Sequence, residues 1–394
     1  MMHKQLMESF KEIFHQEEYR TFFAPGRINL IGEHTDYNGG NVFPCAITFG
    51  TYALASKRDD ALICVYSLNF PEKGVISFSL HDLDYKQEHD WANYPKGMIR
   101  YLIEAGYTVD SGINIMFYGN IPNGAGLSSS ASIELVTGVT MEGLFQFELD
   151  RLELVEIGKR VENCFIGVNS GIMDQFVIGM GKARYGVLLN CQTLNFTYAP
   201  LELDNYNIII MNTNKRRELT ASKYNERRME CEQALASLQE VIDIRSLGEL
   251  NEKMFEQYKH VIKEDNLRKR AKHVVYENCR TLQSVKELKE NNIKEFGRLM
   301  NESHCSLRDD YEVTGQELDT LVESAWKQEG IIGARMTGAG FGGCAIAIVG
   351  KECTDQFICK VGQKYREIIG YEATFYVANI GDGARELQRD MEII

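Results

Sequence analysis

The sequence lacks the spacings at which cysteine binds zinc. Its ten cysteines are scattered over 394 residues, with no C-x-x-C pair and no cluster of cysteine and histidine. This pattern excludes a zinc module and predicts reduced, mostly buried thiols.

Long apolar runs are also missing. No run approaches the roughly 20 residues of a membrane-spanning helix. Residues 1–16 lack the apolar core of a signal peptide, and Leu6, Phe10, Ile13 and Phe14 instead fit one face of a helix. We therefore expect a cytoplasmic protein without a membrane partner.

An excess of positive charge is absent as well. The net charge of −13 opposes nucleic acids and anionic membranes as partners. An anion must therefore be attracted by a local feature, such as a helix N-terminus together with Mg²⁺.

The length predicts two domains, because single cores stop growing at roughly 250 to 300 residues. No linker, internal repeat or low-complexity tract marks the boundary, which we place near residue 205, giving domains 1–205 and 206–394. Strands are predicted at 42–55, 61–67, 75–80, 113–119 and 186–190. Residues 215–307 predict two charged amphipathic helical stretches joined near 246–248. Beyond these, helices are predicted at 318–328 and 355–369, and strands at 344–349 and 374–378.

Residues 124–133, G-A-G-L-S-S-S-A-S-I, form a loop that leads from the strand at 113–119 into a helical pattern. Small residues let an oxyanion approach the unpaired amides of a helix N-terminus, so phosphate is the leading ligand. No lysine follows the glycines, which excludes a Walker P-loop. An ordinary turn with an N-cap is the alternative interpretation.

Residues 24–40 place Arg27, Glu33, His34 and Asp36 among glycines and turn residues. Such a group could bind a metal or make the divergent hydrogen bonds that vicinal sugar hydroxyls require. A loop held together by its own salt bridges is the third interpretation.

Asp174 is a single acid in an apolar and glycine-rich run that ends at Gly181. A carboxylate in such surroundings is costly unless it is paired, so Asp174 is a candidate functional acid with Arg27 as its partner. A helix cap is the competing interpretation.

Residues 335–344 contain a formal G-x-G-x-x-G at Gly338, Gly340 and Gly343. The glycines lead into a strand, whereas a dinucleotide fingerprint follows a strand and opens a helix. We therefore expect either a turn that closes over phosphates or a structural hairpin.

Together these stretches resemble the GHMP small-molecule kinase superfamily, and residues 26–37 closely resemble its galactokinase signature, G-R-x-N-L-I-G-E-H-T-D-Y. The resemblance extends from about Arg20 to the C-terminus. Its further motifs are W-A-N-Y at 91–94, G-L-S-S-S-A-S at 126–132, G-I-M-D-Q-F at 171–176, Y-N-E-R-R at 224–228 and the glycine motif at 338.

The resemblance implies an α+β fold of two domains, one ribosomal-S5-like and one ferredoxin-like, with the active site in the cleft between them. It implies transfer of the ATP γ-phosphoryl group to the C1 hydroxyl of galactose, a step of galactose metabolism, by a monomer without a protein partner. One alternative is a kinase for N-acetylgalactosamine or another hexose, which residues around 168 and 224 would decide. Another is a non-catalytic galactose sensor, but the Ser130-Ala131 step that sensors of the family lack is present here.

The resemblance also implies roles for individual residues. Asp174 would accept the proton of the C1 hydroxyl, and Arg27 would keep Asp174 ionised and stabilise the transferred group. The residues expected around galactose are Glu33, His34, Thr35, Asp36, Gly171, Asp174 and Tyr224. Those expected around ATP are Ser67, Trp91, Gly124, Ala125, Gly126, Leu127, Ser128, Ser129 and Ser130. Ser130 and Glu162 would bind Mg²⁺.

Overall fold

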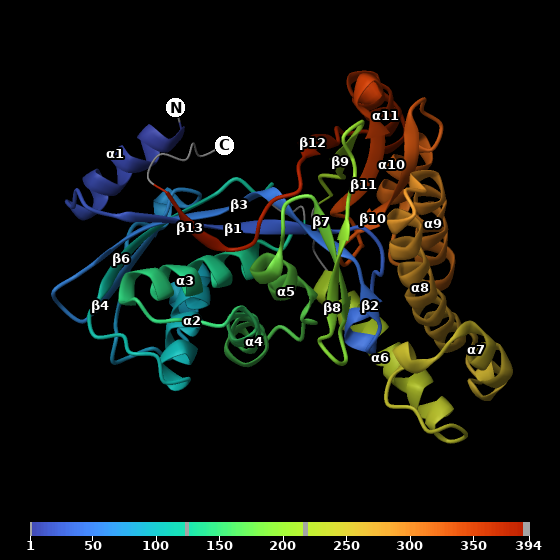
Figure 1. The fold of residues 1–394 in the computed structure, drawn as a ribbon, viewed down its shortest axis with the longest axis horizontal. Helices are drawn as coiled ribbons and strands as arrows, with labels where there is room; N and C mark the ends of the chain where they lie inside the picture. The colour runs from blue at the N-terminus through green and yellow to red at the C-terminus, as the bar shows by residue number, and fades with distance from the viewer. Residues whose placement is uncertain (1, 123–125, 216–219, 389–394) are drawn as a thin grey trace.

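The structure is a computed structural model that describes residues 2–122, 126–215 and 220–388, and within these ranges its strands form three sheets (Figure 1). The strands are β1 (Arg20–Asn29), β2 (Asn41–Val42), β3 (Pro44–Lys57), β4 (Leu62–Ser67), β5 (Ile76–Ser79), β6 (Ile113–Gly119), β7 (Tyr185–Asn190), β8 (Phe196–Pro200), β9 (Tyr206–Asn212), β10 (Ile331–Thr337), β11 (Cys344–Gly350), β12 (Thr374–Ala378) and β13 (Arg385–Leu387). The α-helices are α1 (Met2–Phe14), α2 (Asn93–Glu104), α3 (Ser129–Phe145), α4 (Arg151–Arg160), α5 (Met173–Met180), α6 (Thr220–Gln239), α7 (Glu252–Tyr258), α8 (Asp265–Lys289), α9 (Ile293–Ser306), α10 (Gln316–Ala325) and α11 (Thr354–Ile369).

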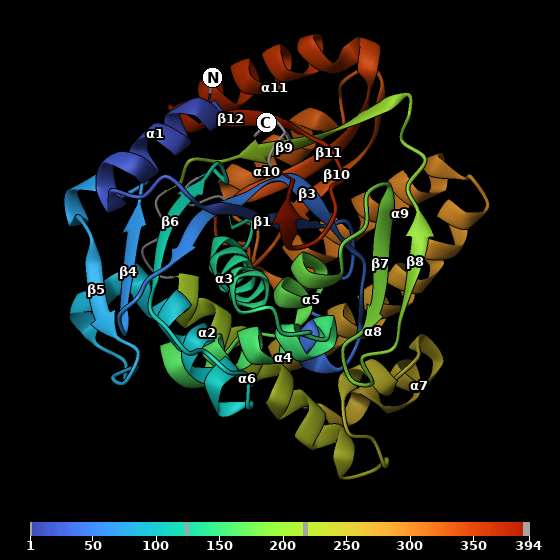
Figure 2. The same cartoon turned by 60° about the vertical axis from the view of Figure 1, so that its left-hand side comes forward.

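The first sheet has the strand order β13-β1-β3-β6-β4-β5, with β4 and β6 parallel to each other. Successive side chains along its strands point to opposite faces of the sheet, and both faces are buried. On β1, Phe22 packs with the helices α2 to α5, whereas Phe23 packs on the opposite face beneath α1. Figure 2 shows α1 and the helices α2 to α5 on opposite sides of this sheet.

Helix α1 is the amphipathic helix that the sequence predicts. Leu6 and Phe10 are fully buried and pack against Phe23, Leu54 and Met116 on the outer face of the sheet. The N-terminal segment therefore covers an apolar sheet face that would otherwise be exposed.

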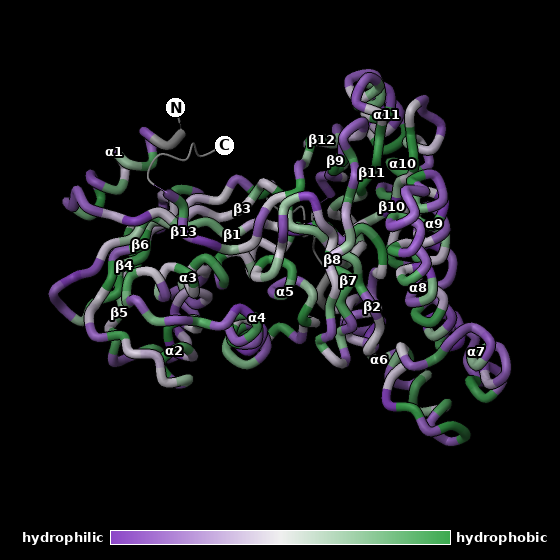
Figure 3. Tube along the Cα trace, in the orientation of Figure 1, coloured by the Kyte–Doolittle hydropathy of each residue, from purple (hydrophilic) through white to green (hydrophobic). Residues whose placement is uncertain are grey.

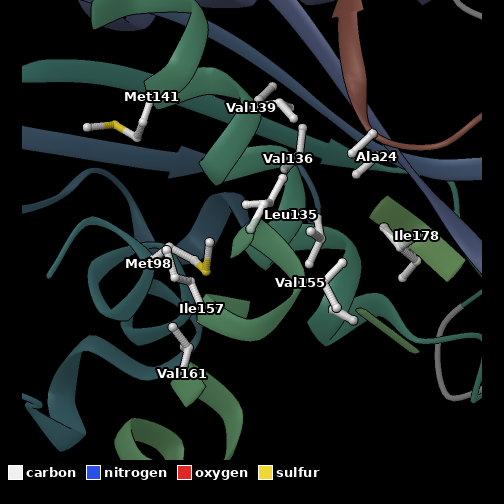
Figure 4. Packing of buried hydrophobic residues seen from close by; sticks show 14 of the residues in the cluster. Ala24, Met98, Leu135, Val136, Val139, Met141, Val155, Ile157, Val161 and Ile178 are labelled. Carbon is white, nitrogen blue, oxygen red and sulfur yellow. The ribbon is translucent and has the colours of Figure 1, made fainter. Parts of the chain in front are cut away.

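Helix α3 lies at the centre of the first core. Its residues Leu135, Val136 and Val139 share this core with Val155 of α4 and Ile178 of α5, and Figure 4 shows Leu135 and Val136 close to Val155. Because neighbours surround it, α3 is apolar on nearly all sides, as is typical of a buried helix. Its N-terminus is thereby held rigidly in place.

The second half contains an antiparallel sheet of order β10-β11-β9-β12. Strand β11 is buried along its whole length, and the tube in Figure 3 is hydrophobic there. The described part of 215–307 holds α6, α7, α8 and α9 rather than the two predicted stretches. The second stretch is divided twice: the 3-10 turn Lys259–Val261 separates α7 from α8, and Asn292, which accepts a bond from Glu295 N, caps the start of α9.

A third core joins the two halves of the chain. Ile28 and Phe43 of the first half share it with Ile208, Phe296 and Ile346 of the second. In addition, β13 returns to pair with β1. The division near residue 205 stays a prediction. Among the described helices, none is both long and apolar enough to cross a membrane.

Gly297 of α9 lies against the backbone of β10, which brings helix and strand into direct contact. A Cβ atom on Gly297 would lie 2.0 Å from the carbonyl oxygen of Ile332. We expect Gly297→Ala to lower the free energy of unfolding by about 1 to 3 kcal/mol, because overpacking outweighs the better helix propensity of alanine. Urea denaturation measures this change.

Gly362→Ala is the matched control, since Gly362 also lies within a helix. Its Cβ would meet only ring atoms of Phe375, at 3.2 and 3.7 Å, and the ring can shift. This variant should be neutral or slightly more stable, and an equal loss in both variants would contradict the packing argument.

Candidate functional site

A cavity of about 540 Å³ lies between the two halves. It is of the size that small ligands occupy. Most of the predicted site residues line it: Arg27, Glu33, His34, Asp36, Gly126, Leu127, Ser128, Ser129, Ser130, Glu162, Gly171, Asp174 and Tyr224. Gly124 and Ala125 lie outside the described residues. The fold thus brings together side chains from distant parts of the chain.

Arg27 and Asp174 form a bidentate ion pair in this cavity. Arg27 donates from Nε to Oδ1 and from Nη2 to Oδ2, both at 2.8 Å. A bulge in β1 between Pro25 and Arg27 sets the direction of the arginine, which also donates to the carbonyl of Gly126 at 2.8 Å. Burial lowers the pKa of Arg27, but the charge and hydrogen bonds of Asp174, together with the charges of Glu33 and Asp36, outweigh this effect and the pKa is raised. The predicted pairing is confirmed.

Asp174 lies in the first turn of α5 but does not cap it, because Ile172 occupies the cap position. Besides Arg27, its Oδ2 accepts a bond of 2.5 Å from the hydroxyl of Ser128. The helix-cap interpretation is therefore wrong. Instead, three side chains from separate elements meet at the cavity wall.

The serine loop leads directly into α3, as predicted. Ser128 adopts a left-handed conformation with φ 63° and its side chain does not cap the helix. Within the described residues, the first-turn amides of α3 thus have no side-chain cap, and the positive end of the helix faces the cavity. This end is suited to an anion.

Ser130 and Glu162 are adjacent, with 2.8 Å between the serine Oγ and carboxylate Oε1. Glu162 lies on the π-helical turn Val161–Ile166 that extends α4, and its Oε2 accepts bonds from Ser170 and Gln175 at 2.6 and 2.8 Å. Hydroxyl and carboxylate oxygens are ligands that Mg²⁺ prefers. The described residues offer no group of three acids, histidines or cysteines for a metal, so an ion held here would need oxygens from phosphate or water.

Glu33 is held by two neighbouring residues of the second half. Its Oε2 lies 2.8 Å from Nη1 of the fully buried Arg335, and its Oε1 accepts a bond of 2.9 Å from the amide of Gly338. The neighbouring His34 bonds through Nδ1 to the hydroxyl of Tyr37 at 2.8 Å. Burial, with the charges of His273 and Arg335, lowers the pKa of His34 to about 3, so its ring is neutral.

Asp36 lies directly against the backbone at Gly171. A Cβ atom at Gly171 would be 1.9 Å from Oδ2 of Asp36, so only glycine admits the carboxylate there. Burial, and next the charge of Asp174, raise the pKa of Asp36 to about 7. This part of the cavity therefore changes charge near neutral pH.

Aromatic rings close the same side of the cavity. Tyr224 of α6 lies 5.7 Å from the ring of His34 and 5.3 Å from that of Tyr37. The hydroxyl of Tyr37 in turn bonds to that of Tyr311 at 2.8 Å. Flat rings and carboxylates side by side suit a sugar, which has an apolar face and a polar rim.

Three predicted residues do not reach this cavity in the part of the chain that is described. Thr35 is buried, and its hydroxyl bonds to the carbonyls of Gly32 and Asn41. Ser67 and Trp91 lie together near β6, since Ser67 pairs with Phe117 in the sheet and the Trp91 ring meets Phe117 edge-on.

The glycine motif forms the hairpin between β10 and β11, with Thr337 paired to Cys344. Its residues Gly338, Gly340 and Gly343 all have positive φ. The expected hairpin is confirmed, and Ala339 at its tip lines the cavity.

Sequence reasoning missed the role of Arg335, although it singled out the stretch that begins there. A lone arginine in the apolar run of β10 is the signal that was available, because a buried charge needs a partner.

Comparison with known proteins agrees with this geometry. The galactokinase galactose-binding signature matches residues 8–57, the GHMP kinases N terminal domain residues 93–182 and the GHMP kinases C terminal domain residues 284–367. The chain is similar to the galactokinase of Streptococcus thermophilus, at 58% identity over 383 residues, which is 97% of this chain and 99% of that protein. It is equally similar to the galactokinase of Exiguobacterium sibiricum, at 58% identity over 391 residues, which is 99% of this chain and 100% of that protein.

Solved structures show the same relationship. Lactococcus lactis galactokinase complexed with galactose superposes with a TM-score of 0.96 at 52% identity, covering 98% of this chain and 100% of that chain. Methanococcus jannaschii mevalonate kinase, at 20% identity and a TM-score of 0.66, shares the fold alone.

The raised pKa of Asp36 makes stability depend on pH. Between about pH 4 and 7 the folded state keeps a proton that the unfolded state releases, so folding loses stability as pH rises through this window. Asp36→Asn removes this penalty. We expect the ligand-free variant to exceed the native chain in unfolding free energy by up to about 4 kcal/mol at pH 8.

Urea denaturation at pH 4, 5, 6, 7 and 8 measures the difference, which should grow with pH and level off above about pH 7. Asp59→Asn, at an exposed position, controls for the change in net charge. A difference that is the same at every pH would contradict the titration of Asp36.

Proposed function

This chain belongs to the galactokinase family of the GHMP kinases, and we propose from that premise which of its residues carry the reaction. The activity is ATP-dependent phosphorylation of galactose. The observation that supports the assignment of residues is the Arg27–Asp174 pair, which lies in the same cavity as the N-terminus of α3, where Ser128 leaves the first-turn amides without a side-chain cap.

In the reaction, the C1 hydroxyl oxygen of galactose attacks the γ-phosphorus of ATP. A bond forms between this oxygen and phosphorus, the bond from phosphorus to the β,γ-bridging oxygen breaks, and ADP leaves. The proton of the C1 hydroxyl passes to Asp174. The products are α-galactose 1-phosphate and ADP.

Asp174 is the proton acceptor in this proposal, and Arg27 has two tasks. Its bidentate contact keeps Asp174 ionised and fixes the direction of the carboxylate. Its positive charge also lies where negative charge moves during phosphoryl transfer, a reaction in which positioning and electrostatics dominate.

We assign the ATP phosphates to the N-terminus of α3 and the loop before it. The supporting feature is the set of first-turn amides that no side chain caps in the part of the chain that the structure describes. The residues proposed to hold the phosphates are Gly124, Ala125, Gly126, Leu127, Ser128, Ser129 and Ser130. Ser67 and Trp91, which flank Phe117, are proposed to lie near the nucleoside.

The GHMP kinase family transfers phosphoryl groups from ATP, typically with a divalent metal. We propose Mg²⁺ as this metal and Ser130 and Glu162 as the residues that would hold it. Mg²⁺ neutralises charge on the phosphates when it is bound. Ser170 and Gln175 keep the Glu162 carboxylate turned toward Ser130.

We place galactose against Glu33, His34, Asp36, Gly171, Asp174 and Tyr224. The similar Lactococcus lactis enzyme was solved in complex with galactose, and the cavity wall formed by these residues combines carboxylates with an aromatic ring. Thr35 contributes indirectly, by tying the backbone at Gly32 to that at Asn41.

We also propose that the chain acts as a monomer with a division near residue 205. The supporting observation is that residues of a single chain, from both sides of that position, line the cavity.

A coupled assay of ADP release tests the substrate. We expect turnover with galactose and Mg-ATP, and much weaker turnover with glucose, because a wrong epimer leaves buried polar groups unpaired. N-acetylgalactosamine is the third substrate to compare. Preferential turnover of N-acetylgalactosamine would assign the chain to another sugar, and galactose binding without turnover would indicate a sensor.

Asp174→Ala tests the proton acceptor. A general base supplies roughly 10²- to 10⁴-fold, so turnover should fall by at least that range. In this variant Arg27 and Ser128 both lose their hydrogen bonds to Asp174, which can lower stability. The midpoint of thermal unfolding must therefore be measured together with the turnover rate.

Asp84→Ala, which removes an exposed acid paired with Arg100, is the control for loss of an ion pair and should keep normal turnover. Near-normal turnover in Asp174→Ala would remove Asp174 as the base.

A further inference from the structure

Helix α8 holds the loop of residues 32–41, here called the sugar loop, at three points. His273 bonds through Nε2 to the carbonyl of Glu33 at 3.1 Å. Glu277 Oε1 accepts hydrogen bonds from the backbone amides of Gly32 and Glu33, at 3.0 and 3.3 Å. Asn278 Oδ1 accepts a hydrogen bond from the backbone amide of Asn41 at 2.8 Å. These contacts come from the second half of the chain, whereas the loop belongs to the first.

The backbone of the sugar loop requires such an anchor. Gly32 has φ 93° and His34 has φ 61°, so the chain turns through the left-handed region twice within three residues. In this turn two successive N–H groups point the same way, toward one oxygen of Glu277, which is the arrangement of an anion-binding nest.

Glu277 is itself fixed and charged. It is fully buried. Its Oε1 also accepts a hydrogen bond from the hydroxyl of Ser303 at 2.6 Å, and its Oε2 accepts one from Arg280 Nε at 2.9 Å. Arg335, the partner of Glu33, lies 4.0 Å away. Burial raises the pKa of Glu277, but these charges outweigh it and leave the pKa at about 2, so the carboxylate stays ionised.

We propose that Glu277 is a positioning residue for the sugar site, fixing the turn from which Glu33, His34 and Asp36 enter the cavity. This inference rests on the proposed function of that site. Glu277 is not among the residues that line the described cavity, so it acts through the loop.

The role predicts a selective effect on the two substrates. The phosphate-binding segment 126–130 begins α3, whose contacts are with the first core rather than with α8. Loss of the anchor should therefore weaken binding of galactose and leave binding of ATP unchanged.

Glu277→Asp is the main test, because it keeps a charge near Arg280 and Arg335 but withdraws the oxygen from the two loop amides. We expect the KM for galactose to rise about tenfold or more, with the KM for ATP within about twofold of the native value. Calorimetric titration with galactose should show the same loss in binding.

Ser303→Ala is the second variant. It removes a hydroxyl that donates to Glu277 Oε1 and accepts a bond of 3.1 Å from Nε of Arg335, so it loosens the anchor without changing a residue of the sugar loop. It should raise the galactose KM by roughly threefold, with the ATP KM unchanged. If Glu277→Asp does not fold, this variant decides. Val274→Ala, a buried neighbour on α8 that packs in the second core, controls for general destabilisation and should leave both KM values unchanged.

Equal changes in both KM values, or none in either variant, would overturn the inference while the native chain still phosphorylates galactose. A rise in the galactose KM of Val274→Ala as large as that of Glu277→Asp would also overturn the inference. Failure of the native chain itself to turn over galactose would instead contradict the proposed function.

Discussion

The buried ion pair between Arg335 and Glu33 is the interaction on which the site depends. It crosses from β10 to the sugar loop, and both side chains are almost inaccessible to water, at 0% and 2% exposure. A buried charge must be matched, so neither side chain can move alone. The pair continues through Glu277 to Arg280, and this alternation of charge makes the sugar loop part of the second half's rigid framework.

The other wall of the cavity is also held in place by burial, in this case of a helix. Helix α3 is locked into the first core by its apolar sides, so its N-terminus offers fixed amides without further cost of ordering. Arg27, from the bulge of β1, then ties the preceding loop to Asp174 on α5. Both walls of the cavity are thus preorganised, the α3 wall by the core of the first half and the sugar loop by its contacts with the second half.

Much of the fold could be predicted from local patterns, and the failures have physical causes. The bounds of β6 and β12 agree with the predicted runs because turn residues bound their alternation. Strand β1 was not predicted, since Pro25 and Gly26 interrupt its pattern and only pairing with β3 reveals the bulge. Two predicted helical stretches proved to be four helices in the described residues, because a 3-10 turn at Lys259–Val261 ends α7 and an asparagine cap at 292 starts α9 within a continuous charged pattern.

The sequence alone determined the chemical groups of the site: an arginine and acids among glycines, a serine loop before a helix, and a lone aspartate in an apolar run. It also determined the family, because several motifs of that family occur in the same order along the chain. Only the tertiary structure decided which groups meet. Arg27 and Asp174 are 147 residues apart, and Glu277 reaches Gly32 across 245 residues. Local periodicity reports which face of an element is buried, but not which distant element covers it, so such pairings exist only after the distant elements have packed together.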